Sequence, residues 1–204
     1  MRRPDEPSRR RWTRARLLRT AIGGGAVVAG GAATASWSGG GVPAAAPSER
    51  GDADILNLFL LLEQVQEGFY REALRRARLD GELRRFAGVV AAQEGEHAAR
   101  LTERLGARAR ARPRLDLGDA VTDPERFRAA AIKLEETTIA AYIAQAANLT
   151  RSAVAAIVPL VSVEARQVAW VRDLARVSPA PRAADPGRDR DDVLGELREG
   201  GFIQ

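Results

Sequence analysis

The 204-residue sequence contains no cysteine and a single histidine, and only 5% of its residues are aromatic. The lack of cysteine excludes a disulfide framework, a thiolate zinc or iron–sulfur site, a cysteine nucleophile and a lipidated cysteine. No glycine-rich phosphate loop follows a strand pattern, and no basic run is interleaved with aromatic residues. Nothing therefore supports nucleotide, haem or nucleic-acid binding. Any bound metal must have oxygen and nitrogen ligands.

The net charge of +5 is unevenly distributed along the chain. Residues 1–46 carry eight arginines against two acidic residues, so the remaining 158 residues have a net charge of −1. An uncharged, glycine-rich block, 21–35, follows the basic start, and small residues suited to cleavage lie at 33–35 and, as a weaker candidate, at 44–46. This is the three-part layout of a secretory signal. The block is only mildly apolar, whereas a helix that spans a bilayer needs about 20 strongly apolar residues.

The run Ser8-Arg9-Arg10-Arg11-Trp12-Thr13-Arg14 resembles the twin-arginine (Tat) signal, in which two arginines follow a serine or threonine and precede an aromatic or aliphatic residue. The resemblance implies that the Tat translocase is a partner, and that the protein is exported, already folded, to the periplasm, the cell surface or the extracellular space. The alternative is a flexible arginine-rich tail that binds RNA or acidic lipid. That alternative gives the glycine-rich block no role, so we expect residues 1–46 to be a Tat-type signal peptide and linker.

Four helices are predicted in residues 52–177, where alanine, leucine, arginine and glutamate dominate and no strand pattern occurs. The first should begin at Asp52 or Asp54 as N-cap and end near residue 78; the others should cover about 82–105, 124–147 and 153–177. Short turns join the helices within each pair, and a long connection, 107–122, joins the two pairs. We therefore expect an all-α protein, an antiparallel four-helix bundle with a crossover. Pro159 should kink the fourth helix, and the tail, 178–204, should dock on the bundle.

The second predicted helix pair repeats a pattern of the first. In each pair a Leu-Glu dipeptide is followed, seven residues after the glutamate, by one of the two tyrosines of the chain. A second glutamate comes 31 or 29 residues after the first and opens an E-x-x-H or E-x-x-Q motif. The members are Glu63, Tyr70, Glu94 and His97 in the first pair, and Glu135, Tyr142, Glu164 and Gln167 in the second. A pseudo-two-fold relation between the pairs would bring the four glutamates to one level of the bundle.

The surroundings of these glutamates are strongly apolar. Glu63 follows the run 55–62, and Glu164 follows 153–163, in which Ser162 is the only polar side chain. A carboxylate buried at such a level is costly unless it is paired, protonated or bound to a metal. The i, i+3 spacing of E-x-x-H also places the carboxylate and the imidazole on one helical face. Two helices that supply a glutamate and two that supply E-x-x-H can hold two divalent ions without sulfur.

The segments LFLLLEQVQEGFYREAL, AAQEGEHAARL, AIKLEETTIAAYIAQA and VSVEARQVAWVRDL, in this order, resemble the bacterial ferritin-like domain family that includes desiccation-related proteins. The tail is similar to that family's usual ending, so the resemblance covers residues 52–204. It implies a ferritin-like four-helix bundle with a di-iron or di-manganese centre. The implied ligands are Glu63, Glu94, His97, Glu135 and Glu164, with Gln167 in the position of the second histidine. Because an amide oxygen is a poorer ligand than imidazole for iron or manganese, the second metal position is expected to be weak, replaced by another ion, or empty.

Several alternatives stay open at the level of the sequence. Glu136 is the alternative ligand to its neighbour Glu135, although alignment with Glu63 favours Glu135. Tyr70 and Tyr142 are either hydrogen-bond donors to the carboxylates or, as the simpler interpretation, ordinary core aromatics. The function is either that of an exported metal protein in iron or oxidant handling, or that of a metal-free structural or stress-related bundle of the cell envelope. Either could form an oligomer.

Overall fold

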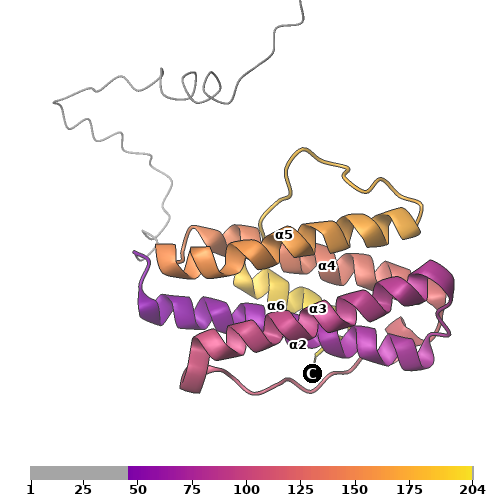
Figure 1. The fold of residues 1–204 in the computed structure, drawn as a ribbon, viewed down its shortest axis with the longest axis horizontal. Coiled ribbons are helices and arrows are strands. Elements are labelled where there is room, and N and C mark those ends of the chain that lie inside the picture. Colours follow the sequence, from indigo (N-terminus) through magenta and orange to yellow (C-terminus); the bar gives the residue numbers. More distant parts are fainter. Residues whose placement is uncertain (1–45, 204) are drawn as a thin grey trace, which may run out of the picture. The chain divides into compact units, whose positions relative to one another are not determined.

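The computed structural model describes residues 46–203, so the expected signal peptide lies almost entirely outside the described residues. Four long helices form an antiparallel bundle, which confirms the predicted all-α fold (Figure 1). They are α2 (Glu49–Arg76), α3 (Gly81–Leu105), α4 (Pro124–Ala146) and α5 (Arg151–Leu174). Two 3₁₀ turns, η1 (Gly106–Arg108) and η2 (Gly118–Val121), lie in the crossover between α3 and α4, and a short helix, α6 (Arg190–Glu199), follows in the tail.

Side-chain caps explain where two of the helices begin. The Asp123 carboxylate accepts hydrogen bonds of 3.0 Å from the backbone N–H groups of Glu125 and Arg126, and Pro124 occupies the first turn of α4. Helix α2 begins at Glu49, capped by Ser48, which is earlier than the expected start at Asp52 or Asp54. Asp52 instead accepts hydrogen bonds from the backbone N–H and the hydroxyl of Thr150, at 2.8 and 2.6 Å. A residue predicted as a cap therefore ties α2 to the turn between α4 and α5.

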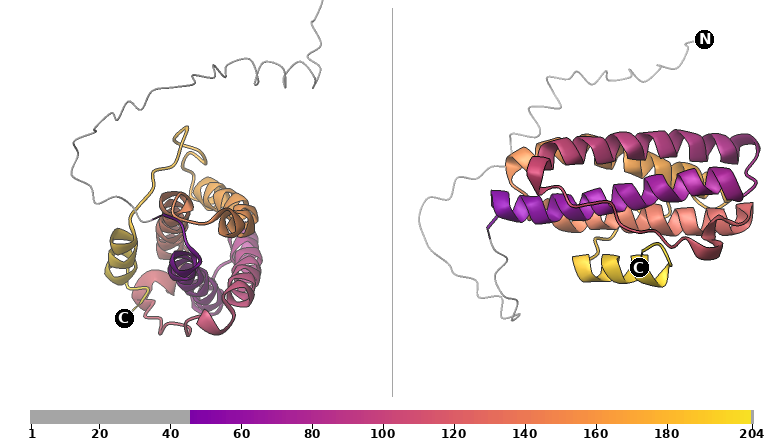
Figure 2. Two further views of the ribbon diagram at one scale, coloured as in Figure 1. Left: turned by 90° about the vertical axis from the view of Figure 1, so that its left-hand side faces the viewer. Right: turned by 90° about the horizontal axis from the view of Figure 1, so that it is seen from below.

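The crossover and the tail both pack on the bundle. The Asn57 side chain on α2 donates to the carbonyl of Arg108 and accepts from the N–H of Arg110, which fixes the crossover along α2. At the tail, Phe202 is buried, and its ring centroid lies 5.8 Å from that of Phe69 on α2. Seen end-on in Figure 2, α6 lies outside the ring of four long helices. The tail therefore contributes Phe202 to the hydrophobic core, although α6 itself lies outside the four long helices.

Helix α5 differs from its neighbours in polarity. Among the described residues it is the one helix long and apolar enough to cross a membrane, with a mean hydropathy of 1.4 over an 18-residue window. Between residues 153 and 165 its exposed side chains are all uncharged, and Val158 is 55% exposed. Its inner face carries Glu164 and Gln167, both buried. Pro159 lies inside α5, and the helix continues through it to Leu174.

Aromatic rings pack within the core at two places along the bundle. The rings of Phe59 and Tyr142 stack with centroids 4.0 Å apart. Elsewhere in the core, Tyr70 makes edge-on contacts with Phe86 and Phe127, at 5.7 and 5.8 Å between centroids. Both tyrosines are fully buried and point their hydroxyl groups at glutamates. The aromatic core therefore supplies hydrogen-bond donors to the buried carboxylates.

Candidate metal centre

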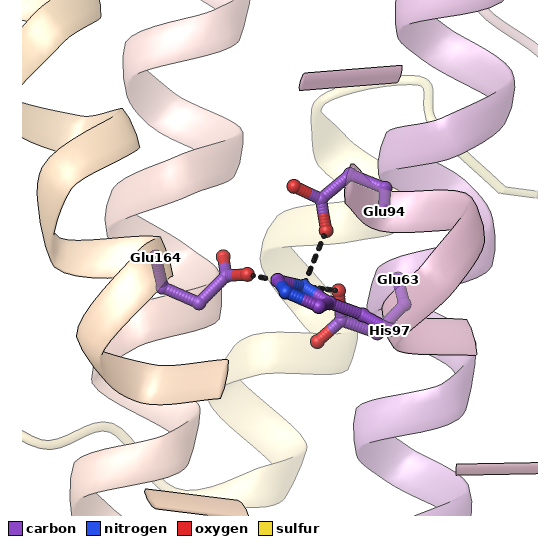
Figure 3. A group of neighbouring side chains, drawn as sticks. All are labelled: Glu63, Glu94, His97 and Glu164. Carbon is purple, nitrogen blue, oxygen red and sulfur yellow. Dashed lines mark hydrogen bonds and ion pairs between the residues drawn. The ribbon is translucent and has the colours of Figure 1, made fainter. Parts of the chain in front are cut away.

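Four buried side chains from three helices converge in the core. Glu63 comes from α2, Glu94 and His97 come from α3, and Glu164 comes from α5 (Figure 3). One ligand atom from each residue lies within 4.8 Å of the corresponding atoms of the other three. The three carboxyl groups are fully buried, and His97 is 6% exposed. We call this set the four-residue centre.

The imidazole of His97 is at the middle of this centre. Its Nδ1 atom lies 3.3 Å from Oε2 of Glu63, 3.2 Å from Oε2 of Glu94 and 3.0 Å from Oε1 of Glu164. A single N–H group has one hydrogen to donate, so it cannot satisfy three acceptors. Glu164 Oε1 has no hydrogen bond of acceptable geometry within the described part of the chain, in spite of its short distance from Nδ1. The arrangement therefore presents more acceptor capacity than the protein itself fills.

The second oxygen of each carboxylate is held by a neutral donor. The Tyr142 hydroxyl donates to Glu63 Oε1 at 2.5 Å, and the Gln167 amide donates to Glu94 Oε1 at 2.6 Å. The Gln66 amide makes a longer bond, 3.4 Å, to Glu164 Oε2. All three carboxylates thus share one pattern, in which one oxygen is fixed by a side chain and the other faces His97.

Gln66 is oriented in turn by the fourth long helix. The Thr138 hydroxyl on α4 donates to the Gln66 amide oxygen at 3.0 Å, so the amide nitrogen is turned toward Glu164. Gln66 lies on the inner stripe of α2, three residues after Glu63, and is fully buried. Sequence analysis gave it no role in the site. The feature of the sequence that could have indicated a role for Gln66 is its position on the same helical face as the buried Glu63.

Glu135 lies outside the four-residue centre. It is fully buried, and the Tyr70 hydroxyl donates to its Oε1 atom, whereas Oε2 has no hydrogen-bond partner in residues 46–203. The tyrosine of each helix pair therefore donates to the glutamate of the other pair, because Tyr142 bonds to Glu63 in the same way. The less favoured interpretation of the two tyrosines, as donors to carboxylates, is the one that the structure shows.

The structure also separates the two candidate ligands on α4. Glu136 is only partly buried and forms an ion pair with Arg172 on α5, away from the core. Glu135, its neighbour, points into the core. Gln167, at the position of the expected second histidine, is 2% exposed and donates to Gln93 as well as to Glu94.

Burial and like charges raise the pKa of most of these carboxyl groups. Burial and the charge of Glu63 raise the pKa of Glu164 to about 7. Burial and the charge of Glu164 raise the pKa values of Glu94 and Glu135 well above the ordinary range. Because these three carboxyl groups are buried close to one another, it is unfavourable for all of them to be ionised at the same time.

The pKa values of Glu63 and His97 are shifted in the direction that favours the charged form of each group. Burial opposes ionisation of Glu63, but hydrogen bonds from Glu94, His97 and Tyr142 outweigh it and lower the pKa of this carboxyl group. Burial alone would also lower the pKa of His97, yet hydrogen bonds to the three carboxyl groups raise it to about 12. The carboxyl groups therefore stabilise a positive charge on the imidazole of His97.

The donor set fits a divalent transition metal. Three carboxylate oxygens and one imidazole nitrogen are ligands that iron, manganese and zinc accept, and no sulfur is needed. Glu164 Oε1 lacks a hydrogen bond within residues 46–203, and Nδ1 faces three carboxylate oxygens at once; a bound cation would supply the partner that these atoms lack. The residues that would hold it are Glu63, Glu94, His97 and Glu164.

Comparison with known proteins agrees with this architecture. No curated protein matches the chain significantly. The profile of the ferritin-like domain family matches residues 51–176, which is more than half of the chain and includes all four long helices almost completely. The chain therefore belongs to the ferritin-like domain family.

Proposed function

We propose that this chain is an exported ferritin-like protein that binds iron or manganese at the four-residue centre and takes part in iron or oxidant handling. The observation that carries the proposal is the approach of three buried carboxylate oxygens to His97 Nδ1, at 3.0–3.3 Å. Bound iron or manganese would supply redox chemistry toward dioxygen or peroxide. The sequence resemblance to desiccation-related ferritin-like proteins supports a role in protection against stress.

The protein's own residues would prepare the site before metal binds. Tyr142 and Gln167 fix Glu63 and Glu94 through their outer oxygens, so these carboxylates need little rearrangement to offer the inner ones. Such fixed orientation by surrounding groups typically raises metal affinity about 10- to 100-fold. Full burial of the carboxylates also keeps bulk water away from the ligands. The centre is therefore organised for binding by side chains that are not themselves ligands.

Metal content is the direct test. We expect protein purified after its native export route to contain iron or manganese, and Glu63→Ala and His97→Ala to remove it. Glu96→Ala is the matched control, because Glu96 is exposed and lies between Glu94 and His97 on the same helix. Elemental analysis should show that this control retains the metal. Metal well below stoichiometric amounts in every preparation of the wild type would refute the proposal.

The export part of the proposal rests on the twin-arginine sequence and has its own test. Substitution of Arg9, Arg10 and Arg11 by lysine preserves the positive charge while removing the arginine pair. We expect the wild-type chain to leave the cytoplasm and the triple variant to stay there, as measured by cell fractionation. Export of the triple variant at the wild-type level would show that the Tat translocase is not the route.

A second candidate function is that of a metal-free structural bundle of the cell envelope. It is favoured by the hydrogen bonds that Glu63, Glu94 and Glu164 already accept from neutral side chains, since these form a buried polar network without an ion. A ligand that binds only the folded state must raise the melting temperature. The metal-free function predicts no rise on addition of Mn(II), whereas the metal-binding function predicts a clear one.

A further inference from the structure

The repeated pattern of the chain suggests two equivalent metal positions, but the structure shows two different environments. In the half formed by α2 and α3, a carboxylate and an imidazole face each other, with Glu63 Oε2 and His97 Nδ1 3.3 Å apart. In the half formed by α4 and α5, the corresponding residues are Glu135 and Gln167. Glu135 accepts a hydrogen bond from Tyr70, and Gln167 bonds to residues of α3. The difference lies in what Gln167 offers to its neighbours.

Gln167 turns hydrogen-bond donors, and not an acceptor, toward the carboxylate of α3. Its amide nitrogen is 2.6 Å from Glu94 Oε1 and 3.1 Å from Gln93 Oε1, so both amide hydrogens are used. Gln93 holds this orientation, because its own amide oxygen accepts one of the hydrogens. The amide oxygen of Gln167 is buried and has no partner among residues 46–203. An N–H group directed at a carboxylate oxygen uses one of its two lone pairs and places a positive hydrogen where a cation would otherwise approach.

Gln66 acts in the same way on the carboxylate of α5. Its amide nitrogen faces Glu164 Oε2, and the Thr138 hydroxyl fixes the amide oxygen on the other side. Glu94 and Glu164 therefore each have one oxygen directed at His97 and the other directed at an amide N–H group. The inner oxygens face the imidazole at a common position, whereas each outer oxygen already accepts a hydrogen bond from an amide.

From these contacts we infer that Gln167, supported by Gln66, closes the second position of this ferritin-like centre and limits it to one metal ion per chain. The inference rests on the proposed function, because it presupposes that the four-residue centre binds metal. Glu135 keeps a buried oxygen, Oε2, that has no partner in the described part of the chain, so a candidate ligand for a second ion is present on α4. The missing element is an acceptor of residue 167 on the side that faces Glu94, where the amide nitrogen lies instead.

Two substitutions at residue 167 test the inference. Gln167→His replaces the amide by an imidazole that can serve as a ligand, and Gln167→Glu is nearly isosteric and replaces the donor N–H group by a second acceptor. We expect about one Mn(II) ion per chain in the wild type and about two in each variant. Arg166→His is the matched control, because it adds a histidine to the exposed face of the same helix. The control should still bind about one ion, since its imidazole cannot reach the core.

Mn(II) content after removal of loosely bound metal gives the stoichiometry, and EPR spectroscopy gives an independent readout. The wild type and the control should show the spectrum of an isolated Mn(II) ion, and both Gln167 variants that of a spin-coupled pair. Two ions in the wild type would overturn the inference and leave the proposed function intact. One ion in folded Gln167→Glu and Gln167→His protein would overturn it as well. No binding by the wild type would instead refute the proposed function, and the inference with it.

Discussion

The two helix pairs of the bundle carry the same framework of glutamates and tyrosines, yet only the α2–α3 pair supplies an imidazole. His97 of that pair faces carboxylate oxygens of Glu63 and Glu94 and, from α5, of Glu164, and the candidate ligand atoms of these four residues lie within 4.8 Å of one another. In the α4–α5 pair, Gln167 donates hydrogen bonds to Glu94 and Gln93, and Glu135 is left with a tyrosine as its partner. The two halves therefore differ in one side chain, His97 against Gln167, and on our proposal this difference separates the half that supplies the imidazole ligand from the half whose metal position is closed.

The largest expected effect comes from comparing the two equivalent glutamates directly. Glu63→Gln should weaken Mn(II) binding by at least about 100-fold, because it removes a ligand at His97. Glu135→Gln should change the affinity by less than about tenfold, since Glu135 lies outside the four-residue centre. Titration calorimetry with Mn(II) measures both. Equal losses in the two variants would show that the two halves contribute alike and would contradict the comparison.

The second expected effect is a dependence on pH. The pKa of Glu164 is raised to about 7 and that of His97 to about 12, so both groups bind protons in the folded metal-free protein more tightly than in the unfolded chain. The stabilisation from Glu164 is present below its unfolded pKa and is lost as the pH rises toward 7; that from His97 is lost from about pH 6.5 upward. Glu63, with its lowered pKa, acts in the opposite direction, but at lower pH. The metal-free protein should thus be less stable at pH 8.5 than at pH 6.

Metal binding should show the reverse trend with pH, because the ion competes with protons for the same oxygen and nitrogen atoms. We expect the Mn(II) affinity to rise roughly tenfold per pH unit over this range. Melting curves with and without Mn(II) at pH 6 and pH 8.5 measure both trends, and the gap between the curves should widen with pH. A gap that is constant or narrows would mean that the binding site is not the protonated cluster beside His97.

The smallest expected effect distinguishes the two tyrosines. Tyr142→Phe removes the donor to Glu63 Oε1 and should lower the Mn(II) affinity by about tenfold, because it frees a ligand to move. Tyr70→Phe removes the donor to Glu135 and should leave the affinity nearly unchanged. Both variants lose one hydroxyl from a fully buried ring, so each is the control for the other's effect on stability. A greater loss of affinity in Tyr70→Phe would place the metal on the α4–α5 side.

The helices were predictable because their signals are local. The Asp123-Pro124 cap marks the start of α4, and the apolar stripes mark the buried faces. Asp52 was predicted as an N-cap, but its local preference is overridden by the Thr150 backbone and hydroxyl, which come near only in the folded bundle. Such a contact across 98 residues has no local signature. Cap residues alone therefore predict the end of a helix only to within a few residues.

The candidate site was predictable in its members more than in its arrangement. The repeat predicted four glutamates at one level of the bundle; three of them converge with His97, which E-x-x-H placed on the same face as Glu94, whereas Glu135 lies outside this group. The direction of an amide is set by its neighbours, so the donors that Gln167 turns to Glu94 could not be derived from spacing. The same holds for Gln66, whose orientation depends on Thr138 of another helix.

The most direct test of a metal centre beside His97 of α3 is the position of the ion itself. Crystals of the protein loaded with Mn(II) would reveal it by anomalous scattering. Our account predicts one anomalous peak, within bonding distance of His97 Nδ1 and of the inner oxygens of Glu63, Glu94 and Glu164. A peak bonded to Glu135 and Gln167, or no peak in the core of protein that has been saturated with Mn(II), would contradict it.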